Sequence, residues 1–253
     1  MGVERNAENR ALRVDGLVNA RDLGGLPRRD GTLTPTGVFF RSENIDGVTP
    51  VGWDQVREAG IRTVVDLRQP AERGRDSQPR PDWLTTVHVD LDGLDNVAFW
   101  KDFWNNGLVG TALYFLPHLK VMPERSVAVL AALVRAPEGG VLFHCMAGRD
   151  RTGLIALLLL TAVDAQPEAI VDDYLQTVRL ADVRALNSKR SNDEPAIEAL
   201  CQSLGTTTEG AFRSALSGLD LPAILAASGF SEADRVALAT WRGTVPIAPS
   251  ATD

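Results

Sequence analysis

A ten-residue segment in the middle of the chain constrains the fold more than any other stretch. It reads His-Cys-Met-Ala-Gly-Arg-Asp-Arg-Thr-Gly over positions 144–153 and lies between the apolar runs 141–143 and 154–160. A short apolar run before such a loop is typical of a buried strand, and the longer run after it is typical of a buried helix. The segment therefore predicts a strand, a tight loop and a helix.

The loop contains a cysteine, five intervening residues and an arginine. A helix that begins near Arg151 points its unpaired N–H groups and the positive end of its dipole into the loop, which favours binding of a phosphate dianion. The same field favours the thiolate form of Cys145, a nucleophile beside the phosphate site. Gly148 lets successive N–H groups turn toward one anion. These features predict phosphomonoester hydrolysis through a phospho-cysteine intermediate.

Two more side chains complete the predicted chemistry. Arg151 has a planar fork that can grip two phosphate oxygens, and the Thr152 hydroxyl can donate to the thiolate when the phospho-cysteine is hydrolysed. The bland alternative, a buried strand-end cysteine beside a surface arginine, requires a chance match at six fixed positions. A nucleotide P-loop would end in Gly-Lys-Ser/Thr, and dithiol redox work would need Cys-x-x-Cys; neither is present. The residues expected to bind phosphate are Met146, Ala147, Gly148, Arg149, Asp150 and Arg151.

The pattern His-Cys-x-x-Gly-x-x-Arg-Thr-Gly resembles the signature loop of the cysteine-dependent phosphatases, and the version found here is similar to that of a bacterial tyrosine-phosphatase family. Stretches 19–25, 40–43, 60–68 and 173–175 resemble that family too, so the resemblance spans roughly residues 7–245. It implies the cysteine-phosphatase fold in one domain over residues 1–253. It also implies phosphotyrosine or phosphoinositide substrates and no cofactor.

The periodicity of the chain also predicts an α/β fold. Buried strands are expected over 62–67, 84–89 and 140–144, and short strands and turns over 12–42. Strands that alternate with helices form a mostly parallel central sheet flanked by helices, with the active site beyond the carboxyl ends of the strands. Cys145 follows a strand at that edge.

Helices are predicted from caps, prolines and apolar periodicity. Thr49 and Pro50 cap and begin a helix that reaches about Ala59. A second helix is expected over 112–134, with interruptions near its two prolines. The segment 92–107 is too aromatic for a bare loop.

The region 166–242 has a helical pattern with breaks at 192–195, at Gly205 and at Gly229. By resemblance to the family, the part over 181–230 forms a C-terminal helical region that acts as a lid or a wall of the catalytic cleft. The alternative is that these helices only complete the helical layer of the fold.

A departing alkoxide or phenoxide needs a proton from a carboxylic acid within hydrogen-bond reach. Asp150 lies inside the loop and resembles the family's loop aspartate, so it is the first candidate for the general acid. Asp92, after the strand that ends near Val89, lies where many cysteine phosphatases keep an acid on a separate loop and is the alternative.

Four residues are expected to support the loop without reacting. Asp66 and Arg68 end a parallel strand and should brace the loop, and Thr152 should contact the thiolate. His144 should bond to neighbouring backbone and tune the thiolate, in preference to acting as a base. His88 and His118 lack a matching ligand cluster, so no metal site is expected.

Composition limits the partners and the compartment. A formal net charge of −7 without a basic stripe argues against nucleic acid, and the longest apolar run is too short for a stable membrane insertion. The first ten residues lack the apolar core of a signal peptide, which predicts a cytoplasmic protein, although leaderless secretion stays open. The two cysteines cannot form a disulfide framework.

Three functions remain open at this point. The first is a phosphatase for phosphotyrosine or phosphoinositide substrates, and the second is a dedicated phosphatase for a small phosphorylated metabolite. The third is a silent phosphate-binding protein. It is disfavoured because four intact residues each serve turnover beyond binding: Cys145, Asp150, Arg151 and Thr152. Arg149 stands where the family commonly has lysine, and its guanidinium is expected to be free to bind a second anionic group on a small substrate.

Overall fold

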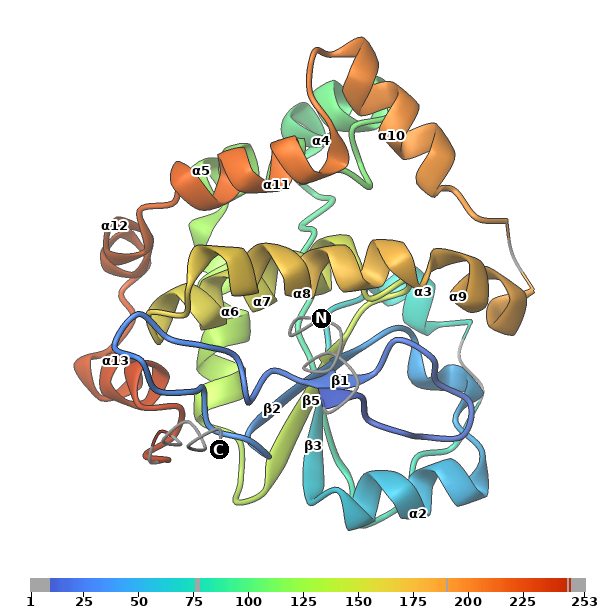
Figure 1. Ribbon diagram of the computed structural model, residues 1–253, viewed down its shortest axis with the longest axis vertical. Coiled ribbons are helices and arrows are strands. Elements are labelled where there is room, and N and C mark those ends of the chain that lie inside the picture. The colour runs from blue at the N-terminus through green and yellow to red at the C-terminus, as the bar shows by residue number, and fades with distance from the viewer. Residues whose placement is uncertain (1–9, 76–77, 190, 245, 247–253) are drawn as a thin grey trace, which may run out of the picture.

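A computed structural model describes residues 10–75, 78–189, 191–244 and 246. Its described part contains a five-stranded sheet with the order β1-β2-β5-β3-β4 (Figure 1). Strand β1 is antiparallel to β2, and the other four strands are parallel, which confirms the predicted mostly parallel sheet. The expectation of no signal peptide concerns mainly residues 1–9, which lie outside the described residues. The strands are β1 Arg21–Asp22, β2 Phe39–Ser42, β3 Ile61–Asp66, β4 Thr85–His88 and β5 Gly140–His144.

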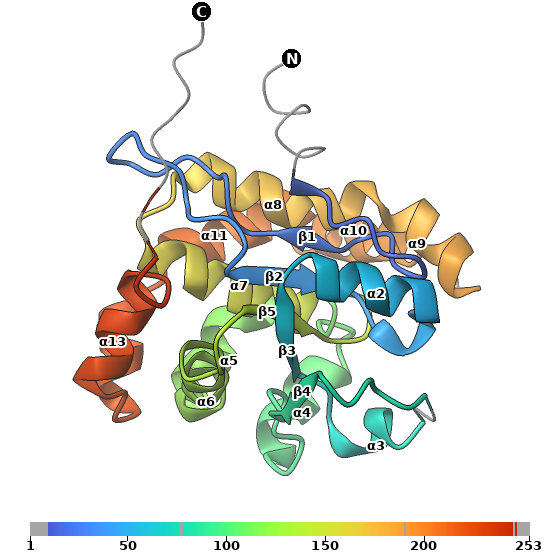
Figure 2. The same cartoon turned by 90° about the horizontal axis from the view of Figure 1, so that it is seen from below.

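Strands β2, β3 and β5 are buried on both faces of the sheet, and their alternate residues point to opposite sides. In β5, Val141 and Phe143 join the larger apolar core, while Leu142 joins the smaller one. Figure 2 shows α2 on one side of the strands and α5 and α6 on the other. This arrangement explains why the central strand reads as a continuous apolar run.

Helices make up most of the remaining described chain. The first part contains η1 Ile45–Gly47, α2 Pro50–Glu58, α3 Pro70–Arg73, α4 Val97–Trp104, η2 Ala112–Tyr114, α5 Phe115–Val121 and α6 Pro123–Val134. The second part contains α7 Asp150–Ala162, α8 Pro167–Arg179, α9 Ala181–Ser188, α10 Glu194–Ser203, α11 Thr208–Ser217, α12 Leu221–Ala227 and α13 Glu232–Ala239.

Most local predictions for helices are confirmed. The Thr49 side chain accepts a hydrogen bond from the N–H of Gly52 at 3.1 Å and so caps α2 at the predicted residue. The aromatic segment contains α4. The segment 112–134 breaks at Met122, before one predicted proline, but the interruption expected at Pro117 is wrong. Pro117 lies in the first turn of α5, where a proline removes no helical hydrogen bond.

The parallel strands end level with one another. Ser42 of β2 and Asp66 of β3 both align with His144 of β5, and Asp66 also aligns with His88 of β4. The loops that follow these strands therefore meet at one edge of the sheet. That edge carries the predicted loop.

Candidate active site

The loop between β5 and α7 turns four consecutive carbonyl groups outward, and each one meets a donor elsewhere in the protein. Because the C=O and N–H of one peptide unit point in opposite directions, the next N–H groups turn inward. Inward N–H groups in series form an anion-binding nest. The four contacts are His144 Nδ1 to the Cys145 oxygen at 3.0 Å, the Asn44 N–H to Met146 at 2.9 Å, Arg184 Nη1 to Ala147 at 3.0 Å and Arg41 Nη2 to Gly148 at 2.6 Å.

Position 148 of the loop requires glycine. Its φ is +66°, in the left-handed region that favours glycine. A Cβ atom there would lie 2.6 Å from the Ser42 oxygen and 2.7 Å from the Glu43 nitrogen. Both the backbone conformation and the contact with the loop after β2 therefore require glycine.

The nucleophile candidate lies between this nest and the start of α7. Cys145 is buried, and the Thr152 hydroxyl donates to its Sγ at 3.1 Å. The first intrahelical bond at the start of α7 runs from the Gly153 N–H to the Arg149 carbonyl at 2.8 Å, so the N–H groups of 150–152 precede the helical ladder. They add the positive end of the helix dipole to the nest.

Arg151 holds two carboxylates at the entrance of the loop. Its guanidinium binds both oxygens of Glu72, with Nη2 to Oε1 at 2.8 Å, and its Nη1 donates to Asp92 Oδ2 at 3.0 Å. Burial opposes ionisation of Glu72, but the hydrogen bonds from Arg151 outweigh it and hold the pKa of that carboxyl below its usual range. The fork thus binds a carboxylate through both terminal nitrogens, the two-pronged contact that guanidinium groups also make with phosphate.

Asp92 is the carboxyl whose proton affinity is most altered at this edge. Burial raises its pKa to about 6, and the negative charges of Glu72, Asp90 and Asp150 add to this effect although Arg151 opposes it. Its main chain is fixed as well, because Trp100 Nε1 donates to the Asp92 carbonyl at 2.8 Å. The alternative acid from the sequence is thus a protonatable group in contact with Arg151.

Asp150 has a different environment. Its Oδ1 accepts a hydrogen bond from Arg149 Nη1 at 2.9 Å, and its side chain is 24% exposed. Its charge is still close enough to raise the pKa of Asp92. Asp150 therefore faces Arg149, whereas Asp92 faces Arg151.

The prediction of a free Arg149 side chain is wrong. The residue is 2% exposed, and its Nε donates to Glu194 Oε1 at 2.7 Å. Its Nη1 also bonds to the Gly110 carbonyl, and its guanidinium lies 5.6 Å from the centre of the Tyr174 ring. These contacts neutralise and bury the group that was expected to reach a second anion.

A buried ionic cluster supports the back of the loop. Arg41, which holds the Gly148 carbonyl, also donates to Asp173 Oδ2 at 2.7 Å. Asp173 Oδ1 accepts from Arg10 at 3.0 Å and from Arg21 at 2.9 Å. Burial disfavours the charge of Asp173, but the three arginines outweigh it and hold the pKa of that carboxyl well below its usual range.

A second route of contacts reaches the loop from β3. Arg68 donates from Nε to Asp66 Oδ1 at 3.0 Å and from Nη1 to Asn44 Oδ1 at 3.0 Å. Asn44 in turn holds the Met146 carbonyl, so Asp66 and Arg68 are placed to brace the loop. Burial lowers the pKa of His144 to about 4, against the effect of Asp66, which leaves a neutral imidazole beside the loop.

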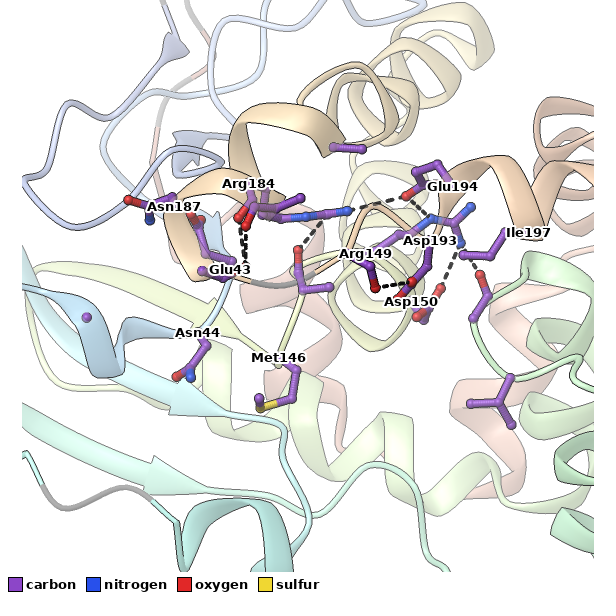
Figure 3. A pocket seen from close by; sticks show the side chains of 18 of the residues that line it. Glu43, Asn44, Met146, Arg149, Asp150, Arg184, Asn187, Asp193, Glu194 and Ile197 are labelled. Carbon is purple, nitrogen blue, oxygen red and sulfur yellow. Dashed lines mark hydrogen bonds and ion pairs between the residues drawn. The ribbon is translucent and has the colours of Figure 1, made fainter.

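A cavity of about 510 Å³ lies beside the loop and is bounded by α9 and α10 (Figure 3). Arg184 of α9 connects the Ala147 carbonyl to Glu194 of α10, with a distance of 3.4 Å to Glu194 Oε1. Within the region 181–230, residues of α9 and α10 line this cavity. Helices α11 and α12 instead pack on the body of the fold, where Phe212 stacks on Tyr174 at 4.0 Å between ring centres.

Among the described residues, no group of three His, Cys, Asp or Glu side chains is arranged to hold a metal ion. Within the same part of the chain, no helix is both long and apolar enough to cross a membrane.

Comparison with known proteins agrees with this geometry. A model of the tyrosine phosphatase family matches residues 12–238. The chain belongs to this family. The triple specificity protein phosphatase PtpB of Mycobacterium tuberculosis is 30% identical over 192 residues, which cover 65% of this chain and 68% of that protein.

Two further matches are more distant or more partial. A protein of Cupriavidus necator is 30% identical over 171 residues, and the match covers 66% of this chain but 62% of that relative's length. A solved structure of TpbA from P. aeruginosa, in complex with phosphotyrosine, matches with a TM-score of 0.43 and 15% identity. That match covers 79% of this chain and 91% of TpbA.

Sequence reasoning missed several residues of the site. Glu72 lies in the first turn of α3, which follows strand β3 in the sequence. This position after a parallel strand could have indicated that Glu72 lies at the same edge of the sheet as the loop. Arg41 and Asp173 fall in stretches that marked the family resemblance, but no pattern indicated that they pair. Arg184 and Glu194 lie on helices whose contact with the loop depends on tertiary packing.

Proposed function

We propose that this protein is a cysteine-dependent phosphatase that hydrolyses phosphate monoesters through a phospho-cysteine on Cys145. The observation that supports this most is the nest of inward N–H groups, fixed by four outward carbonyls around a buried thiol. Such a nest binds the phosphoryl oxygens and stabilises the charge that develops on them. Membership of the tyrosine phosphatase family supports the same reaction.

In the first step, Cys145 Sγ attacks phosphorus and the bond from phosphorus to the ester oxygen breaks. We assign the proton donor for the leaving oxygen to Asp92, because its raised pKa keeps a proton available and it contacts Arg151. This reverses the order expected from the sequence, in which Asp150 came first. Asp150 is already engaged by Arg149 and remains the alternative.

In the second step, water attacks phosphorus and the bond to sulfur breaks. The ionised Asp92 takes the proton from the water, and the Thr152 hydroxyl donates to the departing thiolate over the 3.1 Å contact already present. Arg151 holds two phosphoryl oxygens through both steps. The products are inorganic phosphate and the alcohol or phenol.

Two substrate classes have support. The names of the family and of the mycobacterial relative favour phosphotyrosine and other phosphorylated protein side chains. The cavity walled by α9 and α10 favours the second class, a small phosphorylated metabolite whose organic part fits beside the loop.

The test uses the two cysteines of the chain as a matched pair. Cys145→Ser should abolish hydrolysis of p-nitrophenyl phosphate while the protein still binds inorganic phosphate. Cys201→Ser, which changes a buried cysteine in α10, should keep the activity of the parent protein. Full activity of Cys145→Ser, or activity that requires added divalent metal and survives thiol alkylation, would contradict the proposal.

A further inference from the structure

The cavity beside the loop has the size and position of a substrate subsite. Its volume of about 510 Å³ lies within the range of about 300 to 1,000 Å³ that is usual for small-molecule pockets. One wall consists of loop residues Met146, Ala147, Arg149 and Asp150. The organic part of a phosphate ester bound in the nest can therefore extend into this cavity.

The charges around the cavity disfavour a second phosphate. Its two cations, Arg149 and Arg184, both lie against Glu194, and Arg149 also binds Asp150. Since like charges in a partly buried site repel each other strongly, the surplus of carboxylates disfavours a further dianion. The carboxylates that line the cavity are Glu43, Asp150, Asp193 and Glu194.

Two polar atoms of the lining residues are covered by protein and have no hydrogen-bond partner in the described part of the chain. Glu194 Oε2 accepts no hydrogen bond within the described residues, and Arg149 Nη2 donates none. Glu194 is 8% exposed and Arg149 is 2% exposed, so both atoms belong to side chains that are at least nine-tenths buried. Because both atoms are covered by protein, a ligand in the cavity meets the other polar groups of the lining instead.

The rest of the lining combines polar groups with the apolar side chains of Val109, Met146, Ala181, Ala185 and Ile197, which suit the C–H groups of a ring. Asn44, Asn187, Ser188 and Ser191 supply groups that both donate and accept, while none of the lining residues is aromatic. Figure 3 shows Asn44 and Asn187 on one side of the cavity and Asp193 and Glu194 on the other. Such a surface suits hydroxyl groups on several sides of a ring and offers no stacking partner for a phenyl ring.

We propose that this cavity binds the uncharged polyhydroxyl part of a sugar monophosphate and so selects the substrate. The proposal rests on the phosphatase activity proposed above. A hydrogen bond to a charged side chain contributes enough that losing the ring hydroxyls should cost about tenfold in kcat/KM.

The test compares three esters of the same primary alcohol type. Glucose 6-phosphate carries the ring hydroxyls, cyclohexylmethyl phosphate has a similar ring without them, and glucose 1,6-bisphosphate adds a second phosphate. We expect kcat/KM to be highest for glucose 6-phosphate, by about tenfold over each of the others. Hydrolysis of p-nitrophenyl phosphate by the same preparation measures the basal phosphatase activity.

Two asparagines provide the matched variants. Asn187 lines the cavity and donates to the Gly16 carbonyl at 3.2 Å, whereas Asn106 donates to the Asp102 carbonyl at 2.6 Å and is not among the lining residues. Asn187→Leu should lower the preference for glucose 6-phosphate over cyclohexylmethyl phosphate by about threefold or more, and Asn106→Leu should leave it unchanged. Asn106→Leu should also leave turnover of p-nitrophenyl phosphate unchanged, and the ratio of kcat/KM values for the two esters cancels any change in basal turnover that Asn187→Leu causes.

The outcomes separate the two proposals. If p-nitrophenyl phosphate is not hydrolysed, the phosphatase activity itself is contradicted. If p-nitrophenyl phosphate is hydrolysed but the three compared esters react equally, or the bisphosphate reacts best, the proposed polyhydroxyl subsite is overturned. The proposed phosphatase activity is then still supported. A preference that Asn187→Leu and Asn106→Leu reduce equally also overturns it.

Discussion

Two clusters of arginine and carboxylate side chains lie on opposite sides of the same loop and have opposite charge ratios. Behind the loop, one carboxylate, Asp173, meets three arginines and stays ionised. At the entrance, one arginine, Arg151, meets Glu72 and Asp92, and the pKa of Asp92 rises to about 6. Burial raises the pKa of both carboxyl groups. Three arginines outweigh this effect at Asp173, whereas the one arginine that Asp92 shares with Glu72 does not, so Asp92 can exchange a proton.

The largest effect is expected at the entrance. Arg151→Lys keeps the charge but loses the fork that binds two oxygens at once, so kcat should fall about 100- to 1,000-fold. Turnover of p-nitrophenyl phosphate measures this, with the surface change Arg213→Lys as control. A rate within a few-fold of the parent protein would remove Arg151 from the proposed mechanism.

Behind the loop, the expected effect is on stability. Asp173→Asn leaves three buried guanidinium groups short of their counter-charge and should lower the free energy of unfolding by about 3 to 5 kcal/mol. Denaturant titration measures the change. The control is Glu168→Gln, whose exposed pair with Arg213 should contribute little. Equal midpoints for the two variants would show that the cluster is not a structural support.

The proton donor gives a smaller effect that depends on the leaving group. Asp92→Asn should lower kcat/KM about 100-fold for alkyl phosphates and much less for p-nitrophenyl phosphate, because kcat/KM reports the first step, in which only a poor leaving group needs the proton badly. Asp150→Asn is the matched variant. If Asp150→Asn shows the differential loss and Asp92→Asn slows both substrates alike, the acid is Asp150.

The pH dependence follows from the same carboxyl. Asp92 must be protonated to act as the acid, so kcat/KM for an alkyl phosphate should fall as the pH rises through about 6. This limb should vanish in Asp92→Asn. A parent profile that stays flat from pH 5 to well above the pKa of about 6 would contradict the assignment.

The smallest effect is expected at the connection between the loop and α9. Arg184→Gln weakens the hold on the Ala147 carbonyl but leaves three other carbonyl contacts in place. We expect kcat to fall about threefold to tenfold, with less change in KM. A change in KM alone would indicate a role in binding and not in positioning the loop.

The sequence predicted the parts that depend on near neighbours. Cys145 and Thr152 lie seven positions apart, so the loop that joins the strand to the helix brings them together whatever surrounds it. The alternation of apolar runs was likewise enough to predict the parallel sheet. The helical region expected to form a lid or cleft wall has two parts in the structure: α9 and α10 line the cavity, whereas α11 packs on α8.

The parts that failed depend on pairs far apart in the chain. Glu72 lies 79 positions from Arg151, and Asp173 lies 152 positions from Arg21. The Arg149 side chain is buried against Glu194, which lies 45 positions away, and against Tyr174. A local pattern shows that a guanidinium is present but not which carboxylate will bury it.

The most direct measurement is the detection of the covalent intermediate. Asp92→Asn should slow the water attack that breaks the bond from sulfur to phosphorus, so the intermediate accumulates when this variant is mixed with p-nitrophenyl phosphate and quenched in acid. Peptide mass spectrometry should then locate one added phosphoryl group on Cys145 and none on Cys201. Full turnover with no phosphorylated Cys145 at any time point, or with the phosphoryl group on another residue, would contradict the account.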